Sequence, residues 1–176
     1  MTSRFEDDMN WSSKLFNEQV WPLIKSSLGG GDLLQMEGRP DVELASILDK
    51  YAGIDGWHLH KLGLRGIAAR VQAGVNYKTF TIRHTRRSGA TTEYEKRKTA
   101  IGSPSGWIFP AITVQAYTKT KDGPVVSVGV AYTVDIFDFI EKGLNTENEC
   151  SNATFLVCNW KKMQANGYRV KVIEGA

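Results

Sequence analysis

The chain has 176 residues, of which 41% are hydrophobic and 23% charged, so its composition excludes a disordered or fibrous protein. No apolar run approaches the roughly 20 residues that span a bilayer, and the polar N-terminus has no signal-peptide core. Cys150 and Cys158 are too few for a disulfide framework. We therefore expect one cytoplasmic domain over residues 1–176, with no membrane partner.

The first half of the chain begins with a predicted helix at residues 12–28. Its apolar residues recur at helical spacing, Pro22 should kink or restart it, and Gly29-Gly30-Gly31 should end it. A short helix or turn is expected at 41–48. Runs rich in β-branched and apolar residues then predict strands at 54–59, 66–72 and 79–83.

The second half begins with a helix predicted at 91–99 from its helix-forming residues. Apolar runs at 108–118 and 125–133 predict a β-hairpin, followed by a short helix at 135–141 that Gly143 stops, and by final strands at 154–159 and 168–173. This order favours an α/β domain with one central mixed sheet flanked by helices. Its core should cover about 12–100, with the C-terminal strands and helix at 108–173.

The basic residues are concentrated in one segment. From Lys78 to Lys98 there are seven basic side chains and only Glu93 and Glu95, a charge of +5, whereas the other residues have 15 basic and 17 acidic side chains, a charge of −2. Such a patch suits a polyanion, because neutralising phosphates releases their counterions. The alternative is a solvated, partly salt-bridged surface.

The segment 48–72 has the layout of a metal-binding hairpin. Asp49 precedes one predicted strand, the triplet Gly53-Ile54-Asp55 lies at its start, and a second strand returns at 66–72. Over roughly residues 12–100 this resembles the PD-(D/E)XK nuclease superfamily, which implies a restriction-endonuclease-like fold. By the same resemblance, Asp55 would be the central Mg²⁺ (or Mn²⁺) ligand and Asp49 a less constant one.

The second strand departs from that superfamily, because its (D/E)-x-K triplet is replaced by Arg70-Val71-Gln72. Gln72 has precedent at the lysine position, but an arginine cannot ligate a cation. We considered three explanations. Glu18 of the first helix could supply the missing carboxylate. The acid and lysine could come from the later helix, where Glu93, Glu95 and Lys96 cluster. Alternatively, Arg70 could neutralise Asp55 in an inactive site.

The predicted catalytic residues are therefore Asp55, Gln72, Glu18 and Lys96, and the predicted metal ligands are Asp55, Glu18 and Asp49. Basic side chains near the hairpin are expected to bind nucleic-acid phosphates; they are Arg70, Arg83, Arg86, Arg87 and Lys98. Gln115, within an apolar run, could reach the same groove as Gln72 or lie on an exposed strand face.

The leading hypothesis is Mg²⁺-dependent hydrolysis of DNA, with RNA as an alternative nucleic-acid partner and a homodimer as in many such nucleases. The alternative is a nuclease-like module without catalysis that binds nucleic acid or a protein. A third hypothesis is an accessory protein whose basic strip binds an acidic partner.

Overall fold

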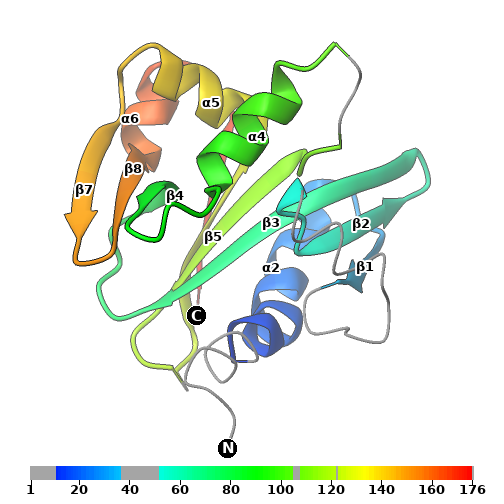
Figure 1. Ribbon diagram of the computed structural model, residues 1–176. Helices are drawn as coiled ribbons and strands as arrows, with labels where there is room; N and C mark the ends of the chain where they lie inside the picture. The colour runs from blue at the N-terminus through cyan, green and yellow to red at the C-terminus, as the bar shows by residue number, and fades with distance from the viewer. Residues whose placement is uncertain (1–10, 37–51, 105–107, 122, 176) are drawn as a thin grey trace, which may run out of the picture.

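The computed structural model describes residues 11–36, 52–104, 108–121 and 123–175, which contain two β-sheets (Figure 1). The larger sheet has the strand order β1-β2-β3-β5-β6-β9, and the smaller one has the order β4-β8-β7. The mixed α/β class and the central mixed sheet are confirmed, whereas the second sheet of three strands was not expected. The strands of the larger sheet are β1 (Asp32–Gln35), β2 (Gly56–His60), β3 (Gly63–Ala73), β5 (Ile112–Thr118), β6 (Val125–Tyr132) and β9 (Val170–Glu174).

The smaller sheet consists of β4 (Thr79–Arg86), β7 (Thr146–Cys150) and β8 (Ala153–Asn159). All of its pairings are antiparallel. In the larger sheet only β3 and β5 are parallel, and the chain between them forms β4 and α4 (Glu93–Ile101). Parallel neighbours need such a crossover, which here places α4 next to β3 and β4.

The N-terminal helix runs through residues 11–28 and changes its geometry near Pro22. A π-helical turn, η1 (Phe16–Val20), precedes α2 (Trp21–Lys25), and a 3₁₀ turn, η2 (Ser26–Leu28), ends the helix. Proline lacks the N–H of the usual i to i−4 bond, so an irregular turn before it accommodates the missing bond. Gly29 follows with φ of 89°, as a left-handed C-terminal residue.

The larger sheet is covered on both faces. On one face, the N-terminal helix packs through Phe16, Val20 and Ile24 against alternate residues of β3, β5 and β6. On the other face lie the smaller sheet, α4, α5 (Thr133–Glu141) and α6 (Trp160–Ala165) (Figure 1). The second core includes Tyr117, Phe139 and Trp160. Because strand residues alternate between faces, β3 presents Ala69 and Val71 to the helix, and Arg70 and Gln72 to the other side.

Most predicted elements are confirmed within a few residues. The hairpin of β2 and β3, the strand β4, the helix α4, the β5–β6 hairpin and the helix α5 ending before Gly143 all form. The prediction at 41–48 lies outside the described residues. β1, β7 and α6 were not predicted. Among the helices of the described ranges, none is long and apolar enough to span a membrane.

Candidate functional site

Asp55 is held firmly at the open end of the β2–β3 hairpin. Gly53 has φ of 62°, which turns the chain inward, and the fully buried Ile54 anchors it in the interior. The Asp55 backbone then donates to the Ile67 carbonyl oxygen at 2.9 Å and accepts from the Met36 N–H at 3.1 Å. In this triplet Gly53 turns the chain, Ile54 is buried in the interior, and Asp55 is held in place by its backbone hydrogen bonds.

The Asp55 carboxylate bonds to the second strand of the hairpin. Its Oδ2 accepts a hydrogen bond of 2.6 Å from the main-chain N–H of Ala69. The carboxylate therefore contacts the residue that directly precedes Arg70-Val71-Gln72 in the chain. The predicted proximity of Asp55 to this triplet is thus present.

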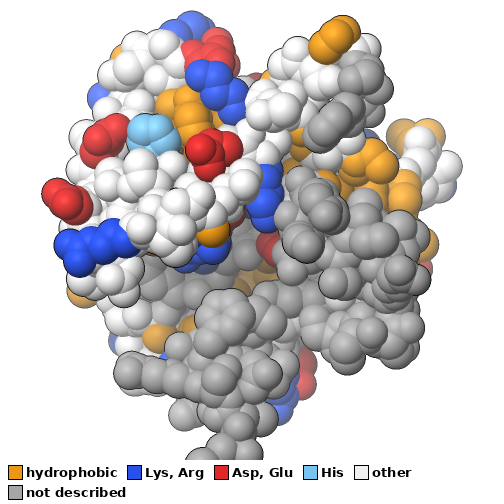
Figure 2. Space-filling model, viewed as in Figure 1, with side chains coloured by type: hydrophobic (Ala, Val, Ile, Leu, Met, Phe, Trp, Pro, Cys, Tyr) orange, Lys and Arg blue, Asp and Glu red, His pale blue; other side chains and the backbone are white. Residues whose placement is uncertain are grey.

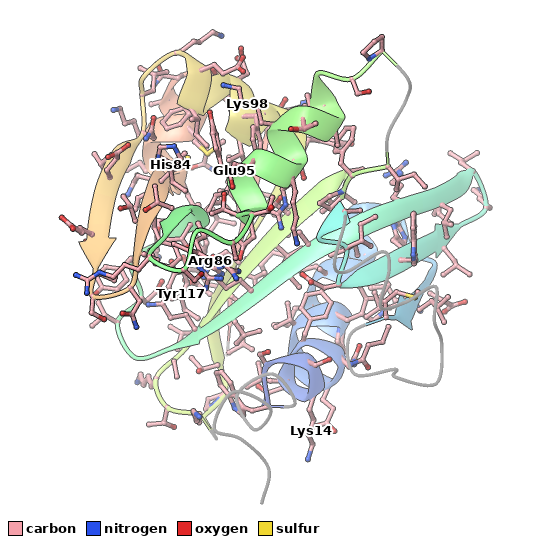
Figure 3. All side chains as sticks on the ribbon, viewed as in Figure 1. Lys14, His84, Arg86, Glu95, Lys98 and Tyr117 are labelled. Atoms are coloured by element: carbon pink, nitrogen blue, oxygen red, sulfur yellow. The ribbon has the colours of Figure 1, made fainter. Side chains whose placement is uncertain are left out.

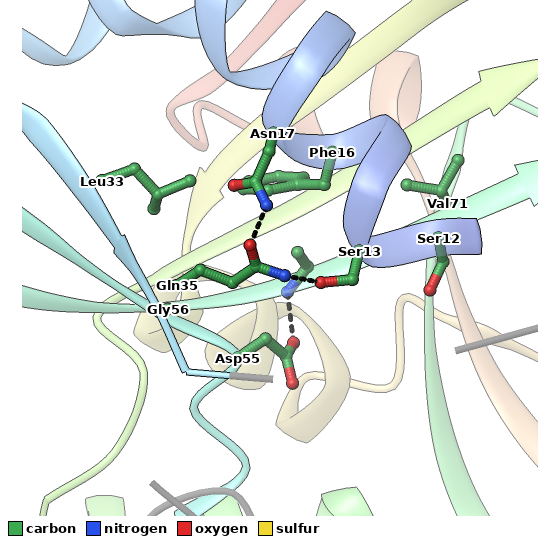
Figure 4. A pocket seen from close by; sticks show the side chains of 10 residues that line it. Ser12, Ser13, Phe16, Asn17, Leu33, Gln35, Asp55, Gly56 and Val71 are labelled. Carbon is green, nitrogen blue, oxygen red and sulfur yellow. Dashed lines mark hydrogen bonds between the residues drawn. The ribbon is translucent and has the colours of Figure 1, made fainter. Parts of the chain in front are cut away.

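Asp55 also lines a small cavity beneath the N-terminal helix, which we call the Asp55 cavity (Figure 4). Its volume of about 20 Å³ is enough for about one water-sized species. Gln35 crosses it, accepting from the Asn17 amide and donating to the Ser13 hydroxyl. The other lining residues are Ser12, Phe16, Leu33, Gly56, Ala69 and Val71. The cavity is polar on the helix side, with Asp55 as the carboxylate among its lining residues.

The other predicted metal ligands are Glu18 and Asp49. Glu18 is exposed on the helix, and its neighbours Asn17 and Ser13 line the cavity instead. Asp49 lies outside the described residues. In the part of the chain that the structure describes, no three His, Cys, Asp or Glu side chains are grouped as a metal site.

Arg70, on the opposite face of β3, pairs with Glu93 of α4. The Arg70 Nη2 donates to both Glu93 carboxylate oxygens, at 2.9 and 3.0 Å. The Arg83 Nη1 lies 3.8 Å from the same carboxylate. The suggested pairing of Arg70 with Asp55 is replaced by this pairing with Glu93. Glu93, which the second explanation invoked, does reach the hairpin, where it is paired with guanidinium groups.

A polar network continues from Arg70 into the interior. The Arg70 Nη1 donates to the Thr81 hydroxyl at 3.1 Å, and this hydroxyl donates to the Gln115 Oε1 at 3.3 Å. Gln115 is 1% exposed and lies beside Arg70 in the β3–β5 register. Of the two interpretations of Gln115, the exposed one is wrong, and its side chain joins the site. The network fixes the orientation of the Arg70 guanidinium.

Arg97 is the buried cation of the site, with only 6% exposure. It lies one helical turn after Glu93, so both side chains point from the same face of α4. Burial lowers the pKa of the Arg97 guanidinium, Glu93 and Asp55 oppose this, and Arg70 adds to it. Arg97 is therefore within electrostatic reach of both carboxylates. We call Arg70, Arg83, Arg97 and Glu93 the Arg–Glu cluster.

The cations of this region crowd one another. Burial lowers the pKa of Arg83, Glu93 opposes the shift, and the nearby charges of Arg70 and Arg86 lower the pKa further. For Glu93, burial would raise the pKa, but Arg70, Arg97 and Arg83 together lower it. The carboxylate therefore stays ionised, and three guanidinium groups share the Glu93 charge, to which Asp55 adds at Arg97. A second anion would relieve the remaining repulsion.

The other predicted residues lie around this cluster. Gln72 is half-buried on the Arg70 face of β3, Lys96 is half-buried on α4, and Arg87 is exposed after β4. Lys98 lies on the outer side of α4, beside Tyr94, whose hydroxyl accepts from its Nζ at 3.2 Å. Figure 3 shows Lys98 beside α4, at a distance from Arg86. Figure 2 shows basic side chains around β4 and α4.

Sequence reasoning missed Arg97, Thr81 and the residues around the Asp55 cavity. Arg97 was counted in the basic segment without a role, although its i, i+4 spacing from Glu93 is a readable signal. The Thr81 contact depends on how β4 leaves the larger sheet, which no local pattern indicates.

Searches of family models, curated proteins and solved structures found no match to this chain.

Proposed function

We propose that the protein binds nucleic acid through the phosphates of its backbone, at the face formed by the Arg–Glu cluster and Arg86. One observation carries this proposal: three guanidinium groups, the buried Arg97 and the partly exposed Arg70 and Arg83, surround the Glu93 carboxylate. Arg70 and Arg83 keep 27% and 29% of their side chains exposed. Both side chains are thus partly accessible, and their charges are incompletely neutralised.

Guanidinium chemistry explains why phosphate is the ligand. The planar fork of an arginine donates two parallel hydrogen bonds to phosphate oxygens. Arg70 is already oriented by Glu93 and Thr81, so less side-chain entropy is lost on binding. Arg83 and Arg86 add charge to the same region, and each phosphate neutralised by a cation releases counterions.

Salt dependence tests this function. Binding of a fluorescently labelled 20-nucleotide DNA, single-stranded or duplex, would be measured between about 50 and 200 mM salt in EDTA. We expect affinity to fall steeply with salt, with a slope of about −0.7 to −0.9 per phosphate contact. An absence of binding at about 50 mM salt would contradict the proposal, and binding of an acidic protein alone would favour the accessory role.

A second candidate function is Mg²⁺-dependent hydrolysis of DNA. The observation in its favour is the hydrogen bond of Asp55 to Ala69, which places a fixed carboxylate beside Arg70-Val71-Gln72. Mg²⁺ is often held by one or two carboxylates together with a substrate phosphate. Asp55 would hold the ion, with Glu18 and Asp49 as further candidates, and bound Mg²⁺ would activate water and polarise the phosphate.

Cleavage assays separate the two functions. Supercoiled, linear and single-stranded DNA would be incubated with Mg²⁺, Mn²⁺ or EDTA, beside the variant Asp55→Asn. Metal-dependent cutting that is lost in Asp55→Asn supports hydrolysis. DNA binding without cutting on any substrate restricts the function to binding.

A further inference from the structure

Two turns come together at one end of the smaller sheet. In the β4–β8 register Arg86 lies opposite Ala153, so the turn after β4 lies beside the turn between β7 and β8. The Arg87 N–H donates to the Asn152 carbonyl oxygen at 3.2 Å and ties the two turns together. They border an open groove of about 600 Å³, which we call the turn groove. Its lining residues are Arg83, Arg86, Arg87, Ser88, Cys150, Ser151, Asn152, Ala153 and Phe155.

A β-bulge builds the basic side of this groove. Residues three apart on a regular strand point to opposite faces, yet Arg83 pairs with Phe155 and Arg86 with Ala153, which share a face of β8. The register shift between Arg83 and Thr85 inserts the extra residue that makes this happen. The bulge therefore directs two arginines into one groove.

The sheet also keeps acidic side chains on its opposite face. Glu147 pairs with Leu156 and Glu149 with Thr154, so both lie on the face away from Phe155 and Ala153. His84, at the bulge, lies 3.6 Å from the Glu147 carboxylate. Strand alternation thus keeps Glu147 and Glu149, which would repel an anion, on the face opposite to Arg83 and Arg86, which attract one.

The lining of the turn groove suits phosphate better than bases. Arg86 and Arg87 supply guanidinium donors, and Ser151 and Asn152 supply a hydroxyl and an amide on the exposed second wall. The aromatic ring that lines the groove, Phe155, already has the guanidinium groups of Arg70 and Arg83 over it, at 5.4 and 5.5 Å. Base stacking would have to displace these cations.

We infer that the turn groove holds the phosphodiester backbone of a nucleic-acid strand, with the β7–β8 turn at Ser151 and Asn152 as its second wall. The inference rests on the proposed nucleic-acid binding and adds to it a path for the strand, from the Arg–Glu cluster past Arg86 to this turn. Because the contacts are to the backbone, binding is independent of base sequence.

The test adds negative charge to the second wall. Ser151→Asp with Asn152→Asp places two carboxylates in an exposed turn, and Ser26→Asp with Thr120→Asp adds the same charge at exposed positions outside the groove. Affinity for a labelled 20-nucleotide strand would be measured at about 100 mM salt. We expect the groove pair to weaken binding about tenfold or more and the control pair by less than about twofold. Arg87→Gln should also weaken binding, and circular dichroism would check the folding of each variant.

The outcomes are distinguishable. Equal effects of both aspartate pairs, or unchanged binding by the groove pair and Arg87→Gln, would overturn the inference while leaving nucleic-acid binding intact. Wild-type protein that binds no strand would overturn the proposed function, and this inference with it. Oligo-dT, mixed-sequence DNA and RNA strands of equal length should bind within about threefold of one another at matched salt. A preference above about tenfold for one base sequence would contradict backbone recognition.

Discussion

The two faces of β3 differ in chemistry although neighbouring residues of the strand supply them. On the helix side, the Asp55 cavity is small and lined by both apolar and polar side chains, with Asp55 held by the Ala69 N–H. On the other side, Arg70 begins a cluster in which cations outnumber carboxylates, and Arg70 and Arg83 remain partly exposed.

This difference shows which side can accept a large anion. A cavity of about 20 Å³ has room for a water or an ion, not for a nucleotide. The arginine side is open to solvent and continues into a groove of about 600 Å³. Binding and any hydrolysis would therefore depend on different faces of the same strand, with Arg97 within electrostatic reach of both Glu93 and Asp55.

Removing Glu93 should have the largest effect on stability. Glu93→Ala leaves the buried Arg97 and the oriented Arg70 without their main counter-charge, and breaking such an ion pair costs about 3 kcal/mol. Urea unfolding would show a lower midpoint with little change in slope. Glu95→Ala would be a poor control because Glu95 caps α4, whereas Glu149→Ala on exposed β7 should change stability by less than about 0.5 kcal/mol. A Glu93→Ala protein as stable as wild type would mean that the cluster contributes nothing to the fold.

The lowered pKa of Glu93 predicts that the free energy of unfolding depends on pH. The pKa of Glu93 is lowered in the folded protein, so its contribution is complete above its unfolded pKa of about 4.3 and is lost as the pH falls through the folded value. Comparing wild type with Glu93→Gln, we expect a constant difference in unfolding free energy above about pH 5 that shrinks in more acidic solution. A difference that grows on acidification would contradict the sign of this shift.

Asp55→Asn should have a smaller effect on stability. An asparagine oxygen can still accept from the Ala69 N–H, but the bond loses its charge, at a cost of about 1 kcal/mol. Thermal unfolding would measure the cost. Destabilisation as large as that of Glu93→Ala would mean that Asp55 contributes as much to stability as the Arg–Glu cluster, contrary to this account.

The smallest expected effect is a difference in reactivity between the two cysteines, which lie on opposite faces of the smaller sheet. Cys150 is exposed at the turn groove, whereas Cys158 is buried, and burial raises the pKa of its thiol to about 12. Iodoacetamide should alkylate one thiol of the native protein and both only after unfolding, as counted by mass spectrometry. A bound nucleic-acid strand should slow the reaction of Cys150, and equal rates with and without DNA would argue against a strand in the groove.

Local patterns predicted the elements of the site better than their assembly. Gly53-Ile54-Asp55 and the alternation of β3 were readable, as was the helix bearing Glu93. β7 was missed because its sequence, TENEC, is polar and exposed throughout, and such a strand has no alternating signal.

The separation of β4 from the main sheet could not be read either, since it depends on long-range pairing with β8. That pairing decides which cation faces which carboxylate. The sequence therefore indicated that the segment was basic, but not that Arg70 and Arg83 would share Glu93 or that a bulge would align Arg83 with Arg86.

The most direct measurement compares the two sides of β3 in one binding experiment. DNA affinity would be measured in EDTA at several salt concentrations for wild type, Arg83→Ala/Arg86→Ala, Asp55→Asn, and the charge-matched control Lys119→Ala/Lys161→Ala at exposed lysines. We predict that the arginine pair loses affinity at least about tenfold and flattens the salt slope by about two units, while Asp55→Asn and the lysine control bind nearly as wild type. Binding that survives loss of both arginines, or falls equally in the lysine control, would contradict the account.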